Sequence, residues 1–188
     1  QRRQKLEPVL HQHLPIFHSS HCLYARYLSK GNSYADCGHV CERHKIHLQD
    51  ENGQDHLVLA DMGCRNTVFN AQAQSGADTL AAWLEEGIAR YRIEFVDENE
   101  ESVRNVLEAY SKLFAARGLA PEPLWSLLSG VEDSNGHAQG ASVGSLRSEK
   151  ERKAGKGRKT TGQRRSHKVV VRRGSDARTP ARKKQKSR

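Results

Sequence analysis

The chain has 188 residues, with 31 Lys or Arg against 22 Asp or Glu and a formal net charge of +9 at pH 7. No run approaches the ~20 apolar residues that a membrane-spanning helix needs, and no basic-then-apolar signal peptide opens the chain. We therefore expect no membrane-spanning segment in this chain, one folded domain and no membrane partner.

The charge is distributed unevenly along the chain. Residues 1–146 carry 13 Lys or Arg and 19 Asp or Glu, a net charge of −6, whereas residues 147–188 carry 18 and 3, a net charge of +15. The second segment has no aromatic residue, so it cannot bury enough apolar surface to offset the entropy lost on ordering. We predict a disordered basic tail over residues 130–188.

The first 13 residues are polar, and we expect a helical or frayed lead-in over 1–13. Because the chain opens with Gln1 rather than Met, it reads as the C-terminal part of a longer protein, and the preceding part of that protein is an expected partner. A targeting segment at the true N-terminus would then be missing. The compartment stays open, with a reducing one, cytoplasmic or plastid, favoured.

Residues 14–75 make up a cysteine-rich region of loops and a hairpin. Pro15 favours an extended conformation in the residue before it. The segments 45–50 and 55–60 are extended runs, and residues 51–53, Glu-Asn-Gly, separate them. An Asn-Gly step between such runs predicts a β-hairpin.

The segment 76–118 predicts a helix, a strand and a second helix in that order. Apolar residues over 80–88 recur at i, i+4 and i+8, and Gly87 is placed to end this helix in a left-handed cap. Residues 91–96 alternate like a strand, and apolar residues over 103–114 follow at helical spacing. This order is typical of an α/β fold with parallel strands, most of whose sheet we expect in the preceding part of the protein.

Four cysteines fall between residues 22 and 64, and the rest of the chain contains none. Their positions, spaced C-x14-C-x3-C-x22-C, are Cys22, Cys37, Cys41 and Cys64. Thiolates are soft ligands, so four of them favour zinc or an iron–sulfur cluster over magnesium or calcium. The spacing leaves three interpretations open: disulfides or buried free thiols, a structural zinc site, and a cluster with ligands from different loops.

Two histidines are close enough in sequence to replace a cysteine as ligand. They are His21, beside Cys22, and His39, between Cys37 and Cys41. The other histidines before residue 57 are interpreted as ordinary polar residues.

Three further residues are candidates for contact with a substrate. Arg65 and Asn66 follow Cys64, where they could contact a phosphate or carboxylate, bond to cluster sulfurs, or only stabilise a turn. Glu94 shares one face of the expected strand with Arg92, as a catalytic acid or as one half of an ion pair.

Several segments around the cysteines resemble the C-terminal part of peptidase family U32. The similar segments are 15–22 (PIFHSSHC), 28–41 (LSKGNSYADCGHVC), 61–70 (DMGCRNTVFN), 71–76 (AQAQSG) and 92–94 (RIE). The resemblance covers about two-thirds of the chain, and the basic tail has no counterpart in it.

The better-understood members of this family act in hydroxylation of ribosomal RNA, transfer RNA and ubiquinone precursors, with a 4Fe–4S cluster and a TIM-barrel-like catalytic domain. The cluster ligands implied by the resemblance are Cys22, Cys37, Cys41 and Cys64. Residues 14–129 would be the C-terminal part of such a barrel-like domain. The relatives' strand motif Ile-Glu-Gly-Arg stands here as residues 93–96, Ile-Glu-Phe-Val, which keeps Glu94 and loses the arginine.

Three functions follow as alternatives. The favoured one is oxygen-independent or cluster-assisted hydroxylation of an RNA base or a small aromatic substrate, with the fragment alone inactive. Proteolysis is the second function, because the family has long been described as collagenase-like proteases. Against it, the chain has no His-Glu-x-x-His zinc helix, and we expect no serine nucleophile elbow. The third is a non-catalytic RNA-binding accessory that acts through the basic tail.

Overall fold

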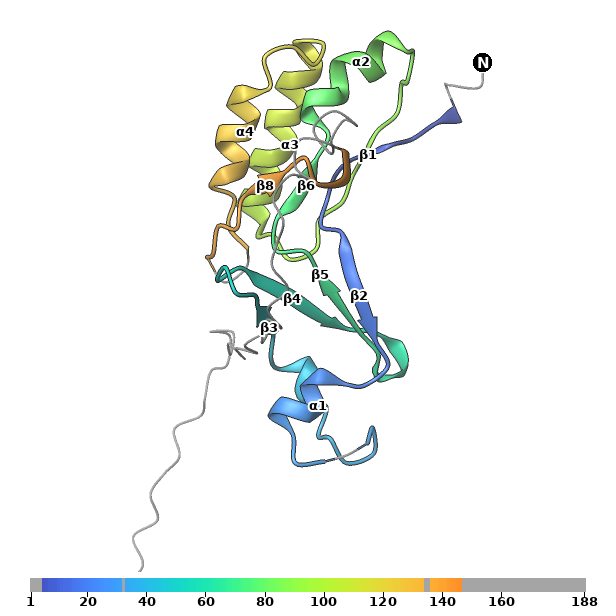
Figure 1. Cartoon of the computed structure of the whole chain (residues 1–188), viewed down its shortest axis with the longest axis vertical. Coiled ribbons are helices and arrows are strands. Elements are labelled where there is room, and N and C mark those ends of the chain that lie inside the picture. The colour runs from blue at the N-terminus through green and yellow to red at the C-terminus, as the bar shows by residue number, and fades with distance from the viewer. Residues whose placement is uncertain (1–4, 32, 134–135, 147–188) are drawn as a thin grey trace, which may run out of the picture.

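The computed structural model describes residues 5–31, 33–133 and 136–146. Within them the chain is a mixed α/β protein with two four-stranded sheets and four α-helices (Figure 1). The strands are β1 Val9–Gln12, β2 Pro15–Ser19, β3 Ile46–Gln49, β4 Asp55–Ala60, β5 Asn66–Phe69, β6 Ala73–Ser75, β7 Arg92–Ile93 and β8 Ala141–Ser142. The helices are α1 Leu23–Leu28, α2 Leu80–Glu85, α3 Glu100–Ala115 and α4 Glu122–Ser129.

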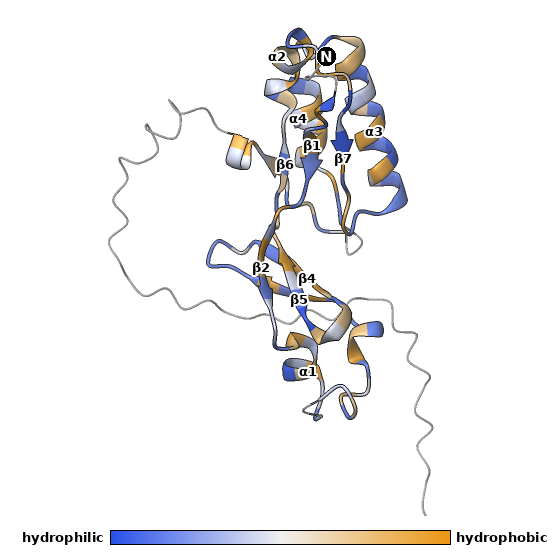
Figure 2. Ribbon diagram, turned by 90° about the vertical axis from the view of Figure 1, so that its right-hand side faces the viewer, coloured by the Kyte–Doolittle hydropathy of each residue, from blue (hydrophilic) through white to orange (hydrophobic). Residues whose placement is uncertain are grey.

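The first sheet has the strand order β7-β1-β6-β8 and lies beside α2, α3 and α4 at one end of the molecule (Figures 1 and 2). Strand β1 runs antiparallel to β6 and parallel to β7, and β6 runs parallel to β8. One apolar core joins this sheet to the helices. Its buried members are Leu10, Ala77, Leu80, Val106, Tyr110, Leu113, Leu124 and Leu128.

The second sheet has the order β2-β5-β4-β3 and is antiparallel throughout. Helix α1 lies at its far end, away from α2, α3 and α4 (Figure 1). The small core beneath it is made of Tyr24, Ile46, Val58 and Val68, and it is partly covered by Cys22 and Cys41. This sheet therefore anchors the cysteine-rich loops.

Several sequence predictions are confirmed by these elements. The hairpin is β3 and β4, and its turn contains Gly53 at φ +81°. The two predicted helices are α2 and α3; Gly87 follows α2 at φ +79°, the left-handed conformation expected of a helix end. The predicted strand over 91–96 is shortened to β7, although its parallel pairing with β1 agrees with the expected α/β order.

Three predictions differ from the structure. The lead-in over 1–13 was expected to be helical or frayed, but residues 9–12 form the central strand β1, because β6 and β7 supply its partners from far along the chain. Helix α4 was not predicted. The tail was expected from residue 130, yet β8 pairs with β6 at residues 141–142, so the described part of 130–146 belongs to the fold; residues 147–188 lie outside the described residues.

The described residues show two small sheets, and the TIM-barrel part expected from the resemblance is not seen among them. None of the helices in the described ranges is long and apolar enough to cross a membrane.

Candidate functional site

All four cysteines line one pocket of about 600 Å³ at the far end of the second sheet. Each of them is half-buried and has no disulfide partner. They reach the pocket from the start of α1, from the loop after it, from a 3-10 turn at Val40–Glu42 and from a 3-10 turn at Met62–Cys64. The fold thus brings together residues that are far apart in sequence.

Cys22 is held at the first turn of α1. It is the N-cap residue, and its Sγ accepts a hydrogen bond from the backbone N–H of Ala25 at 3.4 Å. The next N–H, of Leu23, donates to Oδ1 of Asn66 at 2.5 Å, while Nδ2 of Asn66 donates to the Arg65 carbonyl at 2.8 Å. The fully buried Asn66 therefore ties the start of α1 to the start of β5, beside Cys64.

Cys37 follows a tight loop closed by a carboxylate. The backbone N–H and the hydroxyl of Ser33 donate to Oδ1 of Asp36 at 2.7 and 2.9 Å, and the N–H of Cys37 donates to the Ser33 carbonyl at 3.0 Å. A Cβ atom on Gly31 would lie 2.2 Å from the Asp36 carbonyl oxygen. Only glycine therefore allows the chain to pass this close to the loop that carries Cys37.

Two of the three residues between Cys37 and Cys41 are in the left-handed conformation, Gly38 at φ +69° and His39 at φ +50°. The Arg43 guanidinium donates to the Gly38 carbonyl at 2.9 Å and closes the turn. This sharp reversal lets both cysteines of the C-x3-C pair face the same pocket.

Cys64 lies in the turn between β4 and β5, with Gly63 at φ +77° and Cys64 itself at φ +60°. A left-handed non-glycine residue costs about 1–3 kcal/mol and persists only where its surroundings hold it. The turn is held by the Asp61 N–H, which donates to the Arg65 carbonyl at 2.7 Å, and by the Thr67 hydroxyl, which donates to Asp61 at 2.5 Å. Strain of this kind is concentrated at ligand-binding sites.

The pocket is unfavourable for thiolates in the absence of a cation. Burial raises the pKa of the Cys41 thiol, and the neighbouring Cys22 and Cys37 raise it further, because adjacent thiolates repel one another. Burial also raises the pKa of Tyr24 to about 12, and its hydroxyl donates to the Val58 carbonyl. A bound metal centre would reverse this preference, since metal ligation requires the deprotonated thiol.

The candidate histidines differ in position. His39 lines the pocket; its Nδ1 lies 3.2 Å from Oε1 of Glu42, and its ring centroid lies 5.0 Å from that of Tyr34. His21 is exposed and is not among the described residues that line this pocket.

The other predicted site residues lie outside the pocket lining. Arg65 is exposed beside Cys64, whereas both ends of the Asn66 amide bond to the backbone. Glu94 follows β7 in the first sheet, where its Oε1 lies 3.4 Å from Arg92, which also pairs with Glu7 at 2.8 Å. The structure therefore favours a structural role for Asn66 and an ion pair for Glu94.

Two patterns were missed in the sequence. His11, His13 and Glu98 line a second pocket, which only the long-range pairing of β1 creates. Residues 140–144, Gly-Ala-Ser-Val-Gly, have the Gly-x-Ser-x-Gly spacing that we did not expect. Ser142, however, lies within β8 and pairs with Gln74, not on the strand-to-helix turn that exposes a nucleophilic serine.

The fold and the pocket define an α/β protein that gathers four free thiols at the end of an antiparallel sheet. The sequence model of Peptidase family U32 matches residues 2–122, a span from before β1 to the start of α4 that includes all four cysteines. The chain therefore belongs to Peptidase family U32. Comparisons with curated proteins and with solved structures found no significant match.

Proposed function

We propose that this chain is the cluster-bearing part of an iron–sulfur-dependent U32 protein that acts in hydroxylation of an RNA base or a small aromatic substrate. The proposed ligands are Cys22, Cys37, Cys41 and Cys64. The observation that carries the proposal is their common pocket, reached from four separate segments.

Four thiolates are the ligand set of a structural zinc ion and also of a 4Fe–4S cluster, and we favour the cluster. Zinc requires its ligands about 2.0–2.3 Å from one centre. A 4Fe–4S cluster takes four cysteines and spreads them around a larger core. A pocket of about 600 Å³ with a cysteine on each of its loops supports this choice.

The cluster, when bound, would supply one-electron transfer at this end of the molecule. The chain's own residues would position and shield it: Asn66 and the Tyr24 hydroxyl hold the loops on the sheet. Tyr34 and Met62 line the pocket but are 68% and 89% exposed, so they offer apolar contact to whatever covers the site. The exposed Arg65 guanidinium would favour the binding of a substrate phosphate near the cluster. A TIM-barrel-like catalytic region would lie in another part of the full protein.

Replacing any one of the four cysteines by serine tests the proposal. Anaerobically purified protein is expected to absorb broadly near ~400 nm and to hold about four irons per chain, as thiolate-ligated clusters do. Each serine variant should lose most of this iron. The matched control Met62→Leu changes an exposed pocket residue two positions from Cys64 and should keep it. A colourless protein with one zinc per chain would contradict the proposal.

Proteolysis is the second candidate, favoured by the family to which the chain belongs and by His39 beside the cysteines. A Cys–His nucleophile needs a free thiol, so this function and the cluster exclude each other at any one cysteine. Proteolysis would be favoured if the protein holds no iron and cleaves peptides. This cleavage should be lost in His39→Ala and retained in Ser142→Ala.

A further inference from the structure

A groove of about 560 Å³ lies between α3 and α4, at the end of the molecule away from α1 (Figure 1). Both helices contribute apolar side chains to it, Leu113 from α3 and Leu124 and Leu127 from α4. Two small residues of α3, Ala109 and Ala116, also line it. Neither the family match nor the proposed function gives this groove a role.

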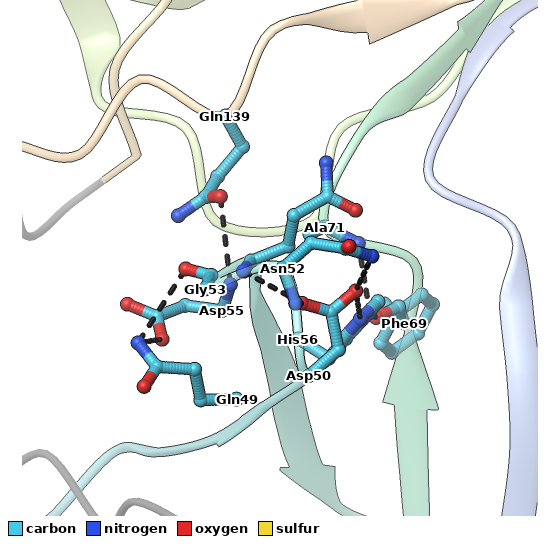
Figure 3. Close-up of polar contacts among 10 residues, drawn as sticks. Gln49, Asp50, Asn52, Gly53, Asp55, His56, Phe69, Ala71 and Gln139 are labelled. Atoms are coloured by element: carbon cyan, nitrogen blue, oxygen red, sulfur yellow. Dashed lines mark hydrogen bonds and ion pairs between the residues drawn. The ribbon is translucent and has the colours of Figure 1, made fainter. Parts of the chain in front are cut away.

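The pocket where the two sheets meet is much smaller, about 50 Å³, and its polar wall is engaged by the chain's own contacts (Figure 3). The Asp55 N–H donates to Oε1 of Gln139 at 3.5 Å, and the Gln49 amide donates to Oδ1 of Asp55 at 3.1 Å. The His137 Nδ1 lies 3.8 Å from Oδ2 of the same carboxylate. One water takes about 10–15 Å³ of such volume, so the groove on α3 and α4 offers far more room to a partner chain.

The turn between α3 and α4 places an apolar side chain beside the groove. Leu119 lines it and is 66% exposed. Its neighbours Gly118 and Ala120 are left-handed, at φ +75° and +53°. The Gly118 N–H donates to the Leu113 carbonyl at 2.8 Å, and a Cβ atom on Gly118 would lie 2.5 Å from the Ala81 nitrogen of α2. Since a left-handed non-glycine residue persists only where its surroundings hold it, the exposed position of Leu119 belongs to a fixed turn.

The groove therefore offers both a protruding apolar side chain and an apolar hollow. A contiguous apolar patch with a polar rim on a protein surface marks an interaction site. Small residues such as Ala109 allow another helix to approach closely, because the distance between packed helices depends on the side chains at their contact.

Two opposite charges on α3 line the same groove. Glu108 and Lys112 pair within the chain at 2.7 Å, and their side chains are 61% and 75% exposed. A two-fold interface requires a patch that is complementary to itself. If α3 packs antiparallel against α3 of a second copy, with the axis near Tyr110, the Glu108 carboxylate of each copy faces the Lys112 ammonium of the other. The patch is thus self-complementary in charge.

The same arrangement accounts for Leu119. An antiparallel register brings the turn of one copy to the N-terminal half of α3 in the other copy, where Asn105 and Leu127 line the groove. The Leu119 side chain of each copy then has an apolar surface to cover it, and its burial removes apolar area from water at both ends of the interface.

We propose that this groove is the interface of a two-fold symmetric dimer of the chain. Leu119 of each copy packs into the groove of the other, and Glu108 of each copy pairs with Lys112 of the other. The apolar contacts supply most of the affinity, and the charge pairs fix the register. The dimer does not depend on the cysteine pocket or on a cluster within it.

Sedimentation velocity of the full chain over a concentration series tests the dimer, and the parent is expected to dimerise. Glu108→Lys and Lys112→Glu each bring like charges together at both symmetry-related contacts, so each should weaken dimerisation at least about tenfold. An equimolar mixture of the two variants restores opposite charges at both contacts and should dimerise as the parent does. A mixture no better than either variant alone would overturn the proposal. A parent that stays monomeric would also overturn it, and would leave the groove to residues 147–188 or to a different protein.

A pair of matched variants locates the apolar contact. Leu119→Asp should abolish the dimer, because it places a carboxylate against the apolar groove of the other copy. Leu107→Asp makes the same change at a 44% exposed leucine of α3 that is not among the described residues lining the groove, and it should leave the dimer intact. Circular dichroism checks that both variants are folded. Equal dissociation constants for the parent and a folded Leu119→Asp variant would contradict the proposed interface.

Discussion

Asn66 illustrates how a single residue supports the cysteine pocket. Its position after Cys64 suggested contact with a substrate, yet the side chain is fully buried and bonds to the backbone on both sides. The amide joins the loop that carries Cys64 to the helix that begins at Cys22. A residue beside Cys64 thus positions that cysteine without facing the pocket.

The first prediction is that Asn66→Ala destabilises the fold and reduces iron uptake. It leaves the Leu23 N–H without its acceptor, and an unsatisfied buried group costs about 1–3 kcal/mol. Urea unfolding should show the loss, and anaerobic reconstitution should yield less iron per chain. Arg65→Ala, on the exposed neighbour, should stay within about 0.5 kcal/mol of the parent; equal effects of the two changes would contradict this role.

The second prediction concerns acid stability. Because burial lowers the pKa of His11 to about 4, from 6.5, the folded state binds fewer protons than the unfolded state between these values. The stability that His11 contributes is present above pH 6.5 and is lost as the pH falls through about 4.

His11→Asn should therefore flatten the fall in unfolding free energy between pH 6.5 and 4. A shift of this size corresponds to roughly 2–3 kcal/mol of pH-dependent stability. Glu98 behaves differently, since the nearby His13 lowers its pKa to about 2 against the cost of burial, and its contribution is lost only below about pH 4.5. Parallel pH profiles for the parent and His11→Asn would contradict the assignment.

At the scale of elements, local signals were sufficient for the hairpin and for α3. The Asn-Gly turn and the apolar face of α3, with Val106, Tyr110 and Leu113 buried, are readable within one window of sequence. Helix α4 was missed because Pro121 was taken to follow the end of α3. In the structure Pro121 is the N-cap residue of α4, and proline is well tolerated at the start of a helix.

The missed strand β1 depends on contacts that no local pattern shows. His11 pairs with Ser75 on one side and with Ile93 on the other. Its burial, and the second pocket with it, could be found only after these partners were known. The clustering of the cysteines could be expected from the family resemblance, whereas the left-handed turns at His39 and Cys64 could not.

The third prediction compares two glycines that both have positive φ. Gly118, at φ +75°, ends α3 against α2: a Cβ atom there would lie 2.5 Å from the Ala81 nitrogen. Gly53, at φ +81°, has nothing within 4 Å of its added Cβ. Gly53→Ala should cost about 1 kcal/mol from the conformation alone, and Gly118→Ala about 1–3 kcal/mol more from the clash. Urea unfolding of both variants measures the difference, and equal costs would contradict the packing of α2 on α3.

At the scale of the whole molecule, the chain combines the described α/β part with a strongly basic C-terminal segment, residues 147–188. Helix α1, which begins after Cys22, lies at one end, and α2, α3 and α4, which carry most of the larger apolar core, lie at the other (Figure 2). Residues 147–188, which carry a net charge of +15, lie outside the described ranges.

The fourth prediction is that the basic segment governs nucleic-acid binding. Removal of residues 147–188 should abolish most binding to single-stranded RNA, because the segment carries 18 of the 31 Lys and Arg. The affinity of the full chain for RNA should fall steeply with salt, because binding releases counterions and added salt opposes that release. Fluorescence anisotropy at two salt concentrations measures both effects. Binding that survives the deletion would place the RNA site in the folded part.

The same deletion separates the cluster-dependent function from the RNA-binding accessory function. If the folded part alone holds the cluster, its iron content should equal that of the full chain. A chain that binds RNA through its basic segment and never holds iron would instead fit the accessory function.

Native mass spectrometry of anaerobically purified protein tests the central claim most directly. The account predicts one species heavier than the chain by four irons and four sulfides, and loss of that species in each of the four cysteine-to-serine variants. A chain that carries a single zinc, or one whose cysteines are joined in two disulfides, would contradict it.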